Sequence, residues 1–110
     1  MFDAKRLNSI AKEYKSKKIA EEEKRRDEII ESIIPFLMGI YDKMLEVAKN
    51  GEYHYEFLLP QEYTKYHSEI EYFFKKYSFT VDVDIDTHVE YFAGFATRII
   101  EIITINISWE

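Results

Sequence analysis

The chain contains no cysteine and, in 110 residues, only three glycines and two prolines. The absence of cysteine excludes disulfides, cysteine-ligated zinc, iron–sulfur clusters and thiol catalysis. Nine tyrosines and eight phenylalanines accompany the scarcity of glycine and proline. This composition argues against disorder and against a loop-rich scaffold.

Long hydrophobic runs are also missing. No run reaches the roughly 18 residues that span a bilayer, and the first residues, MFDAKRLNSIAKEYKSKK, lack the apolar core of a signal peptide. We therefore expect a soluble protein of the cytoplasm that makes no membrane contact.

Positive charge is scarce outside the N-terminal segment. Residues 1–18 hold six basic and two acidic side chains, whereas residues 29–110 hold six basic and fourteen acidic ones. The second segment should repel a phosphate backbone, so direct binding of nucleic acid is not expected.

The pattern of apolar residues changes near Gly51, from helical spacing to alternation. Before it, an apolar stripe at i, i+3, i+4 and i+7 predicts an amphipathic helix, and its members are candidate contacts between copies of the chain: Leu7, Ile10, Ala11 and Tyr14. No apolar residue lies between Glu21 and Glu28, which predicts a solvated helix there. We predict a charged helical arm over residues 1–28 and an α+β domain over residues 29–110.

From Ile29 the apolar density rises, and a broad helical face is expected to point inward: Ile30, Ile33, Ile34, Leu37, Tyr41, Met44, Leu45 and Ala48. Pro35 predicts a kink or a new helix, because proline removes a backbone donor and clashes with the preceding turn. Ser32 is a candidate N-cap for that second helix. Asn50 and Gly51 predict its end.

Alternating residues predict strands over 52–59, 79–86 and 97–109. A second amphipathic helix is predicted over 61–77, with these residues inward: Tyr63, Tyr66, Ile70, Phe73, Phe74 and Tyr77. Residues 87–96 are predicted to be a connection with a turn or bulge at Gly94.

The element order α–β–α–β–β predicts an α+β fold. We expect a three-stranded antiparallel sheet, covered on one face by the helices at 33–49 and 61–77, with its last two strands paired as a hairpin. The last strand is apolar on both sides at Ile99, Ile100, Ile102 and Ile103. This excess of apolar surface favours a second protomer covering its other face.

Asp82, Asp84 and Asp86 begin like a calcium-binding loop. The match fails at the sixth position, Thr87, where such a loop needs glycine, and at the twelfth, Ala93, where it needs glutamate. Alternation with Val81, Val83 and Ile85 favours a solvated strand face, which is a candidate acidic patch for Lys or Arg of a partner.

An enzyme or metal site is the least supported possibility, and no cofactor is expected. The only histidines are His54, His67 and His88, and none forms a metal-binding helical motif. His54, Glu56 and His88 remain an alternative acid–base or metal set.

The stretches KNGEYHYEFLLP, SFTVDVDID and INISW, with a Tyr- and Phe-rich helix after the first, follow one layout. This layout resembles that of many small bacteriophage accessory proteins. The resemblance implies an accessory phage protein in the host cytoplasm that binds and blocks a host enzyme or defence component. It carries over no functional residue.

The leading hypothesis is a non-enzymatic, homo-oligomeric interaction protein that modulates or inhibits another protein. Its acidic body would mimic the charge of nucleic acid, and the candidate contact residues besides the aspartates are Tyr53, Tyr55, Phe92 and Trp109. The alternative is an oligomer that binds or sequesters a nucleotide in an aromatic pocket, with these residues as phosphate ligands: Lys65, Lys75, Lys76 and Arg98.

Overall fold

The computed structural model describes residues 3–110 and opens with two consecutive helices, α1 (Ala4–Ser32) and α2 (Ile34–Lys49). The Asp3 carboxylate caps α1 by accepting a hydrogen bond of 3.0 Å from the backbone N–H of Lys5. The helix breaks at Ile33, just before Pro35 in the first turn of α2. The predicted break near the proline is thus confirmed.

Ser32 does not cap α2, so that prediction is wrong. Ser32 is the last residue of α1, and its hydroxyl donates a 2.6 Å hydrogen bond back to the carbonyl oxygen of Ile29. Ile33 occupies the cap position without a side-chain hydrogen bond. Pro35 lacks a backbone N–H, but at the start of α2 this breaks no hydrogen bond, because the first backbone N–H groups of a helix have no partner within it.

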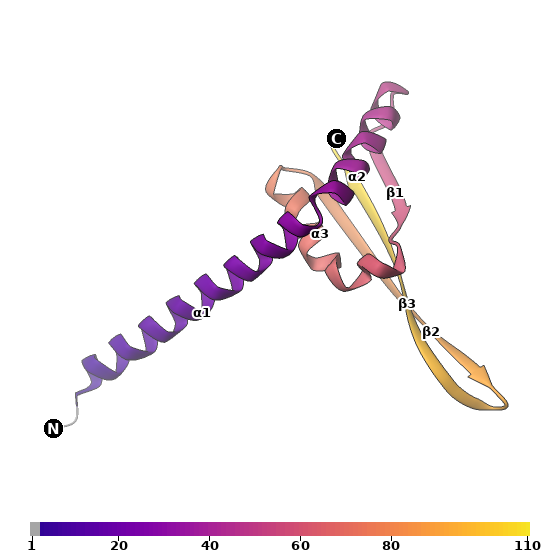
Figure 1. The fold of residues 1–110 in the computed structure, drawn as a ribbon. Coiled ribbons are helices and arrows are strands. Elements are labelled where there is room, and N and C mark those ends of the chain that lie inside the picture. Colours follow the sequence, from indigo (N-terminus) through magenta and orange to yellow (C-terminus); the bar gives the residue numbers. More distant parts are fainter. Residues whose placement is uncertain (1–2) are drawn as a thin grey trace.

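Three strands form one antiparallel sheet in the order β1-β3-β2: β1 (His54–Leu58), β2 (Thr80–Phe92) and β3 (Phe95–Ser108). Between β1 and β2 lie the 3₁₀ helix η1 (Gln61–Tyr66) and α3 (His67–Lys76). The predicted α+β fold, its element order and the hairpin of the last two strands are confirmed (Figure 1).

The β2–β3 hairpin is much longer than the sequence predicted. Residues 87–96, predicted to be a connection, belong to the two strands except for a turn at Ala93 and Gly94. Both turn residues have positive φ, 53° and 81°, as in a type I′ hairpin turn. The outer hairpin, residues 85–103, is called the ribbon below; its base at Ile103 belongs to the core, and the rest extends past the helices into solvent (Figure 1).

The core lies between the helices and one face of the sheet. Its buried side chains are Ile33, Leu37, Ile40, Met44, Leu59, Ile70, Phe74, Val81, Ile103, Ile105 and Ile107. The alternate residues of β3 supply the sheet's part of this core, as the pleat of a strand requires. The opposite face of the sheet, called the open face below, carries Asp82 beside Asn106 and Asp84 beside Thr104.

The long helix α1 meets the rest of the protein at its C-terminal end. There the Arg26 guanidinium lies 3.6 Å from the centroid of the Tyr72 ring on α3. Residues 3–25 are all exposed, and α1 projects away from the body (Figure 1). Residues 3–21 are called the free arm below. No helix within residues 3–110 combines the length and apolar character that crossing a bilayer requires.

Candidate functional site

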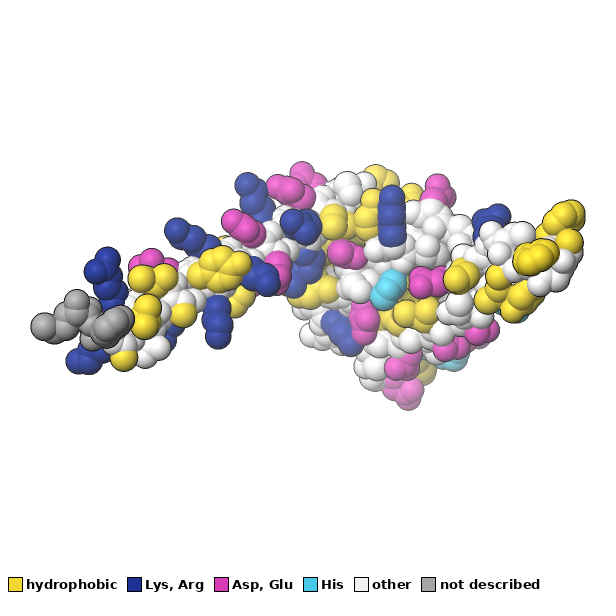
Figure 2. Space-filling view, turned by 90° about the horizontal axis from the view of Figure 1, so that it is seen from below, with side chains coloured by type: hydrophobic (Ala, Val, Ile, Leu, Met, Phe, Trp, Pro, Cys, Tyr) yellow, Lys and Arg dark blue, Asp and Glu magenta, His cyan; other side chains and the backbone are white. Residues whose placement is uncertain are grey.

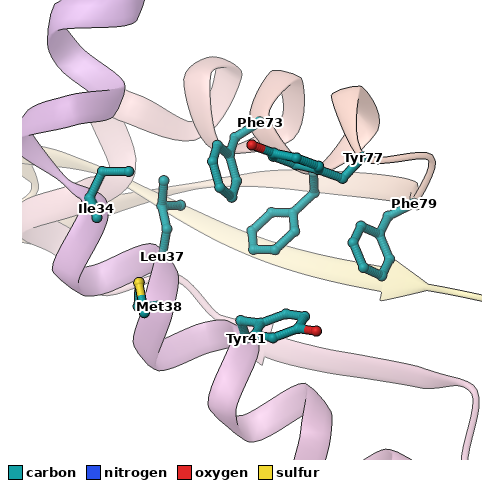
Figure 3. Close-up of a pocket in the computed structure, with 8 residues that line it drawn as sticks. Ile34, Leu37, Met38, Tyr41, Phe73, Tyr77 and Phe79 are labelled. Carbon is teal, nitrogen blue, oxygen red and sulfur yellow. The ribbon is translucent and has the colours of Figure 1, made fainter.

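A hollow lies between α2 and α3. It has a volume of about 430 Å³, and its walls include Ile34, Met38 and Tyr41 of α2, Phe73 of α3, and Tyr77, which directly follows α3. Phe79, just before β2, closes one end. Figure 3 shows the side chains of the two helices facing each other across this space.

A second, smaller hollow of about 200 Å³ continues along α2. Tyr41 and Phe79 line both hollows, and the second one adds Leu45, Ala48 and Trp109. The two hollows together are called the α2 groove below. Trp109 is the one sequence-predicted contact residue that this groove includes.

The groove exists because α2 has more apolar side chains than the sheet can cover. Ile33, Leu37, Ile40 and Met44 are buried against the sheet. A second stripe, at positions i, i+4, i+7 and i+11, is turned to one side and stays exposed: Ile34, Met38, Tyr41 and Leu45.

Several residues predicted to point inward are therefore exposed. Ile34, Tyr41, Leu45 and Ala48 lie on the outer part of α2, and Tyr77 lies at the end of α3 beside the groove. A sheet of three strands covers only one stripe of each helix. The sequence pattern shows which helix positions are apolar, but it does not show how wide a surface will cover them. The same residues form the candidate site that the sequence did not reveal.

Chemically the groove is suited to apolar and aromatic groups. Its larger hollow is lined within residues 3–110 by side chains that carry no charge, and its only side-chain polar groups are the hydroxyls of Tyr41 and Tyr77. Phe73 makes edge contacts with Phe74 at 5.2 Å and Tyr77 at 5.2 Å between ring centroids, which holds the α3 wall in place. Met38, 59% exposed, adds an adaptable thioether.

The acidic row lies on the open face of the sheet, on the other side from the groove. Asp82, Asp84 and Asp86 are exposed and stand beside Asn106, Thr104 and Ile102 of β3. Their spacing along β2 follows the alternation seen in the sequence.

The aromatic contact candidates do not converge on one place. Tyr53 is exposed before β1, and its carbonyl oxygen accepts a hydrogen bond from the backbone N–H of Trp109 at 3.0 Å. Tyr55 is half-buried on the covered face and stacks on Phe57 with ring centroids 5.4 Å apart. Phe92 is exposed at the tip of the ribbon. The arm candidates, Leu7, Ile10, Ala11 and Tyr14, are exposed on the free arm.

The alternative histidine site is not assembled. His54 pairs with Ser108 and His88 pairs with Ile100, so the two histidines are separated by eight positions along β3. At the rise of a strand this is about 27 Å. Within residues 3–110 no group of three His, Cys, Asp or Glu side chains could hold a metal ion.

The cationic candidates for a phosphate site do not line the groove. Lys75 pairs with Glu71 at 2.6 Å on the exposed side of α3. The Lys65 ammonium lies 5.0 Å from the centroid of the Tyr66 ring on η1, and Arg98 lies on the ribbon. Lys76 borders a hollow next to the groove. The structure therefore places none of the four among the residues that line the aromatic groove.

Comparison with known proteins returned no match: no protein-family model, no curated protein and no solved structure is significantly similar to this chain.

Proposed function

We propose that this protein is a non-enzymatic binding module whose α2 groove receives an apolar helix of another protein. The observation that supports the proposal is the continuous exposed stripe of Ile34, Met38, Tyr41 and Leu45 beside an aromatic wall from α3. Contiguous apolar surface of this kind typically marks interaction sites.

The shape of the groove favours a helix as its occupant. Residues 34–48 of α2 form its full length, about 21 Å or four helical turns. A partner helix lying in it would present apolar anchors on successive turns, as in helix-in-groove recognition. The Tyr41 and Tyr77 hydroxyls at its margin would bond to polar groups of that partner.

The purpose of such binding would be to modulate or inhibit the partner. The resemblance to phage accessory proteins supports a host enzyme or defence component as the target. The acidic open face adds a second surface, on the other side of the sheet, that would exclude nucleic acid or compete with it on the bound partner.

The nucleotide-binding alternative receives less support. A phosphate group needs cations or a row of backbone N–H groups. Within residues 3–110 the larger hollow has no charged side chain among its lining residues, so none of the four cationic candidates reaches it. The groove thus fits an apolar protein segment better than a nucleotide.

Site-specific photocrosslinking would test the proposal. A benzophenone amino acid replaces Met38 in the groove and, as a matched control on the same helix, Lys43, which is also exposed. The two derivatives are irradiated in bacterial lysate, and adducts are identified by mass spectrometry. We expect one protein to be crosslinked from position 38 and not from position 43.

The identified partner is then purified, and its affinity is measured by calorimetry. Met38→Glu should weaken binding by about 30-fold, the loss of one hot-spot anchor. Leu58→Glu, at an exposed apolar position on the open face, should bind as the unaltered protein does. Equal affinity of the Met38→Glu variant and the unaltered protein would refute the groove as the binding site.

A further inference from the structure

Within residues 3–110, two further apolar surfaces outside the groove are exposed. One is the ribbon, whose tip holds Phe92 and Phe95, 76% and 75% exposed. The other is the free arm, with Leu7 and Tyr14, 66% and 68% exposed. Figure 2 shows hydrophobic side chains gathered at the ribbon tip and along the arm, at opposite ends of the view.

The apolar side of the ribbon continues the core face of the sheet. Ile85 pairs with the buried Ile103, and further out Val89 pairs with Ile99, with the polar pair Thr87 and Glu101 between them on the same face. These pairs share a face with the core residues of β3, because side chains alternate along a strand. Beyond the helices nothing within residues 3–110 covers them, so Ile85, Val89 and Ile99 are exposed.

The free arm presents a narrower apolar surface with basic edges. Leu7, Ile10 and Tyr14 follow helical spacing, while Arg6 and Lys17 flank one side of the stripe and Lys15 flanks the other. A solvated helix of this kind gains little stability in water, because most helical stability in proteins comes from burying an apolar face. The arm therefore lacks the partner its stripe requires.

The two surfaces cannot meet within one molecule. The free arm and the last turns of α1, which contact α3 through Arg26, form one continuous helix. From the body the arm runs to one side and the ribbon to another (Figure 1). Contact between them needs two copies of the chain.

Charge favours this pairing over the others. Residues 3–18 of the arm hold six basic and two acidic side chains. The ribbon and the adjoining Asp82 and Asp84 hold five acidic side chains and one basic side chain, Arg98. Of the five, Glu101 lies on the apolar side of the ribbon, and the other four lie along β2 on the open face. Two arms or two ribbons would repel each other, whereas an arm and a ribbon attract.

The dimensions agree as well. Residues 7–19 of the arm extend about 18 Å as a helix, and residues 85–92 of the ribbon extend about 24 Å as a strand. A helix laid along the ribbon would cover both strands, because paired strands are about 5 Å apart and a helix with side chains is about 10 Å wide.

We propose that the free arm of one copy docks its stripe of Leu7, Ile10 and Tyr14 on the apolar side of the ribbon of a second copy. The basic residues that flank the stripe reach over the β2 edge to Asp84, Asp86 and Glu90. This contact joins two different surfaces. Two copies that each dock their arm on the other's ribbon therefore form a closed dimer, whereas copies that each dock on the next one form an open filament.

Sedimentation of the full chain tests the association, with single substitutions on both sides. We expect concentration-dependent self-association, weakened at least tenfold by Ile10→Glu in the arm and by Ile99→Glu in the ribbon. Both positions are exposed, and circular dichroism verifies that the variants fold. A chain that stays monomeric up to about 1 mM would overturn the proposal.

Charge reversal identifies the contacting surfaces. The arm variant Arg6→Glu/Lys15→Glu/Lys17→Glu and the ribbon variant Asp84→Lys/Asp86→Lys/Glu90→Lys should each lose self-association, and their mixture should regain it. Failure of the mixture to associate would refute the arm–ribbon contact. Raising the salt concentration should weaken association of the unaltered protein, because exposed charges are screened.

Met38→Glu separates this inference from the proposed function. The substitution lies in the groove, outside both surfaces, so it should leave self-association unchanged. If it dissociates the oligomer and Ile10→Glu does not, the groove is the contact between copies, and the arm–ribbon proposal is wrong. Partner binding by a monomeric arm variant would leave the proposed function intact.

Discussion

Two neighbouring leucines show how the position along a strand decides the energetic role of a residue. Leu58 ends β1 on the open face and is 65% exposed, whereas Leu59 is 1% exposed in the core. The backbone N–H of Leu59 also donates a 2.8 Å hydrogen bond to the carbonyl oxygen of Ile103. The same side chain therefore buries nearly all of its apolar surface at one position and little at the next.

We predict that Leu59→Ala lowers the free energy of unfolding by about 2–5 kcal/mol, because it removes buried methyl groups and leaves a cavity. Leu58→Ala, with identical chemistry, should change it by less than about 0.5 kcal/mol. Urea unfolding of both variants measures the difference. Equal losses would contradict the register of β1 against β3.

Strand residues were predictable from the sequence because each side chain has only two directions available. The alternation put Tyr53, Tyr55, Phe57 and Leu59 on one side and Glu56 on the other. In the structure Tyr55, Phe57 and Leu59 do lie on the covered side, whereas Tyr53 precedes β1 and is exposed. Helix residues were less predictable, since α2 has apolar side chains around much of its circumference. Tyr41 was assigned to the core for that reason, and it lies in the groove.

At the scale of elements, the ribbon shows why a strand can be missed. Residues 87–92 are rich in strand-forming types, and their partners at 95–101 are equally so. The turn between them is Ala93-Gly94, whereas the usual type I′ pair is Asn-Gly. Without that signal, the sequence marked Gly94 as a turn but did not establish the hairpin around it.

Ala93 is the weak point of this turn, because an alanine at a φ of 53° is in the left-handed region that asparagine and glycine tolerate better. Ala93→Asn should slow hydrogen exchange of the ribbon amides between residues 87 and 99. Gly94→Val, at a φ of 81°, should accelerate it.

Exchange measured residue by residue separates the ribbon from the body. Residues 87–99 of the ribbon lie beyond the helices (Figure 1), so their local opening should respond to the turn while core amides such as that of Ile105 keep their protection. Accelerated exchange throughout the core of Gly94→Val would show that ribbon and body unfold as one unit.

At the scale of the whole molecule, the protein is extended rather than spherical. Its radius of gyration is 20.0 Å and its dimensions are 67 × 49 × 23 Å, whereas a compact domain of this length has a radius of about 13 Å. The sequence indicated a solvated arm because residues 21–28 have no apolar side chain. The directions in which arm and ribbon leave the body depend on contacts such as Arg26 on Tyr72, which no local pattern encodes.

Deleting residues 1–20 should therefore affect shape and stability in different ways. The deletion removes most of the free arm and retains Ile33 and every other residue of the core. We expect the unfolding free energy to change by less than about 1 kcal/mol, since residues 3–20 bury no side chain. Small-angle scattering at concentrations where the protein is monomeric should show a marked fall in the radius of gyration. A large loss of stability with an unchanged radius would mean that the arm folds back on the body and supports its core.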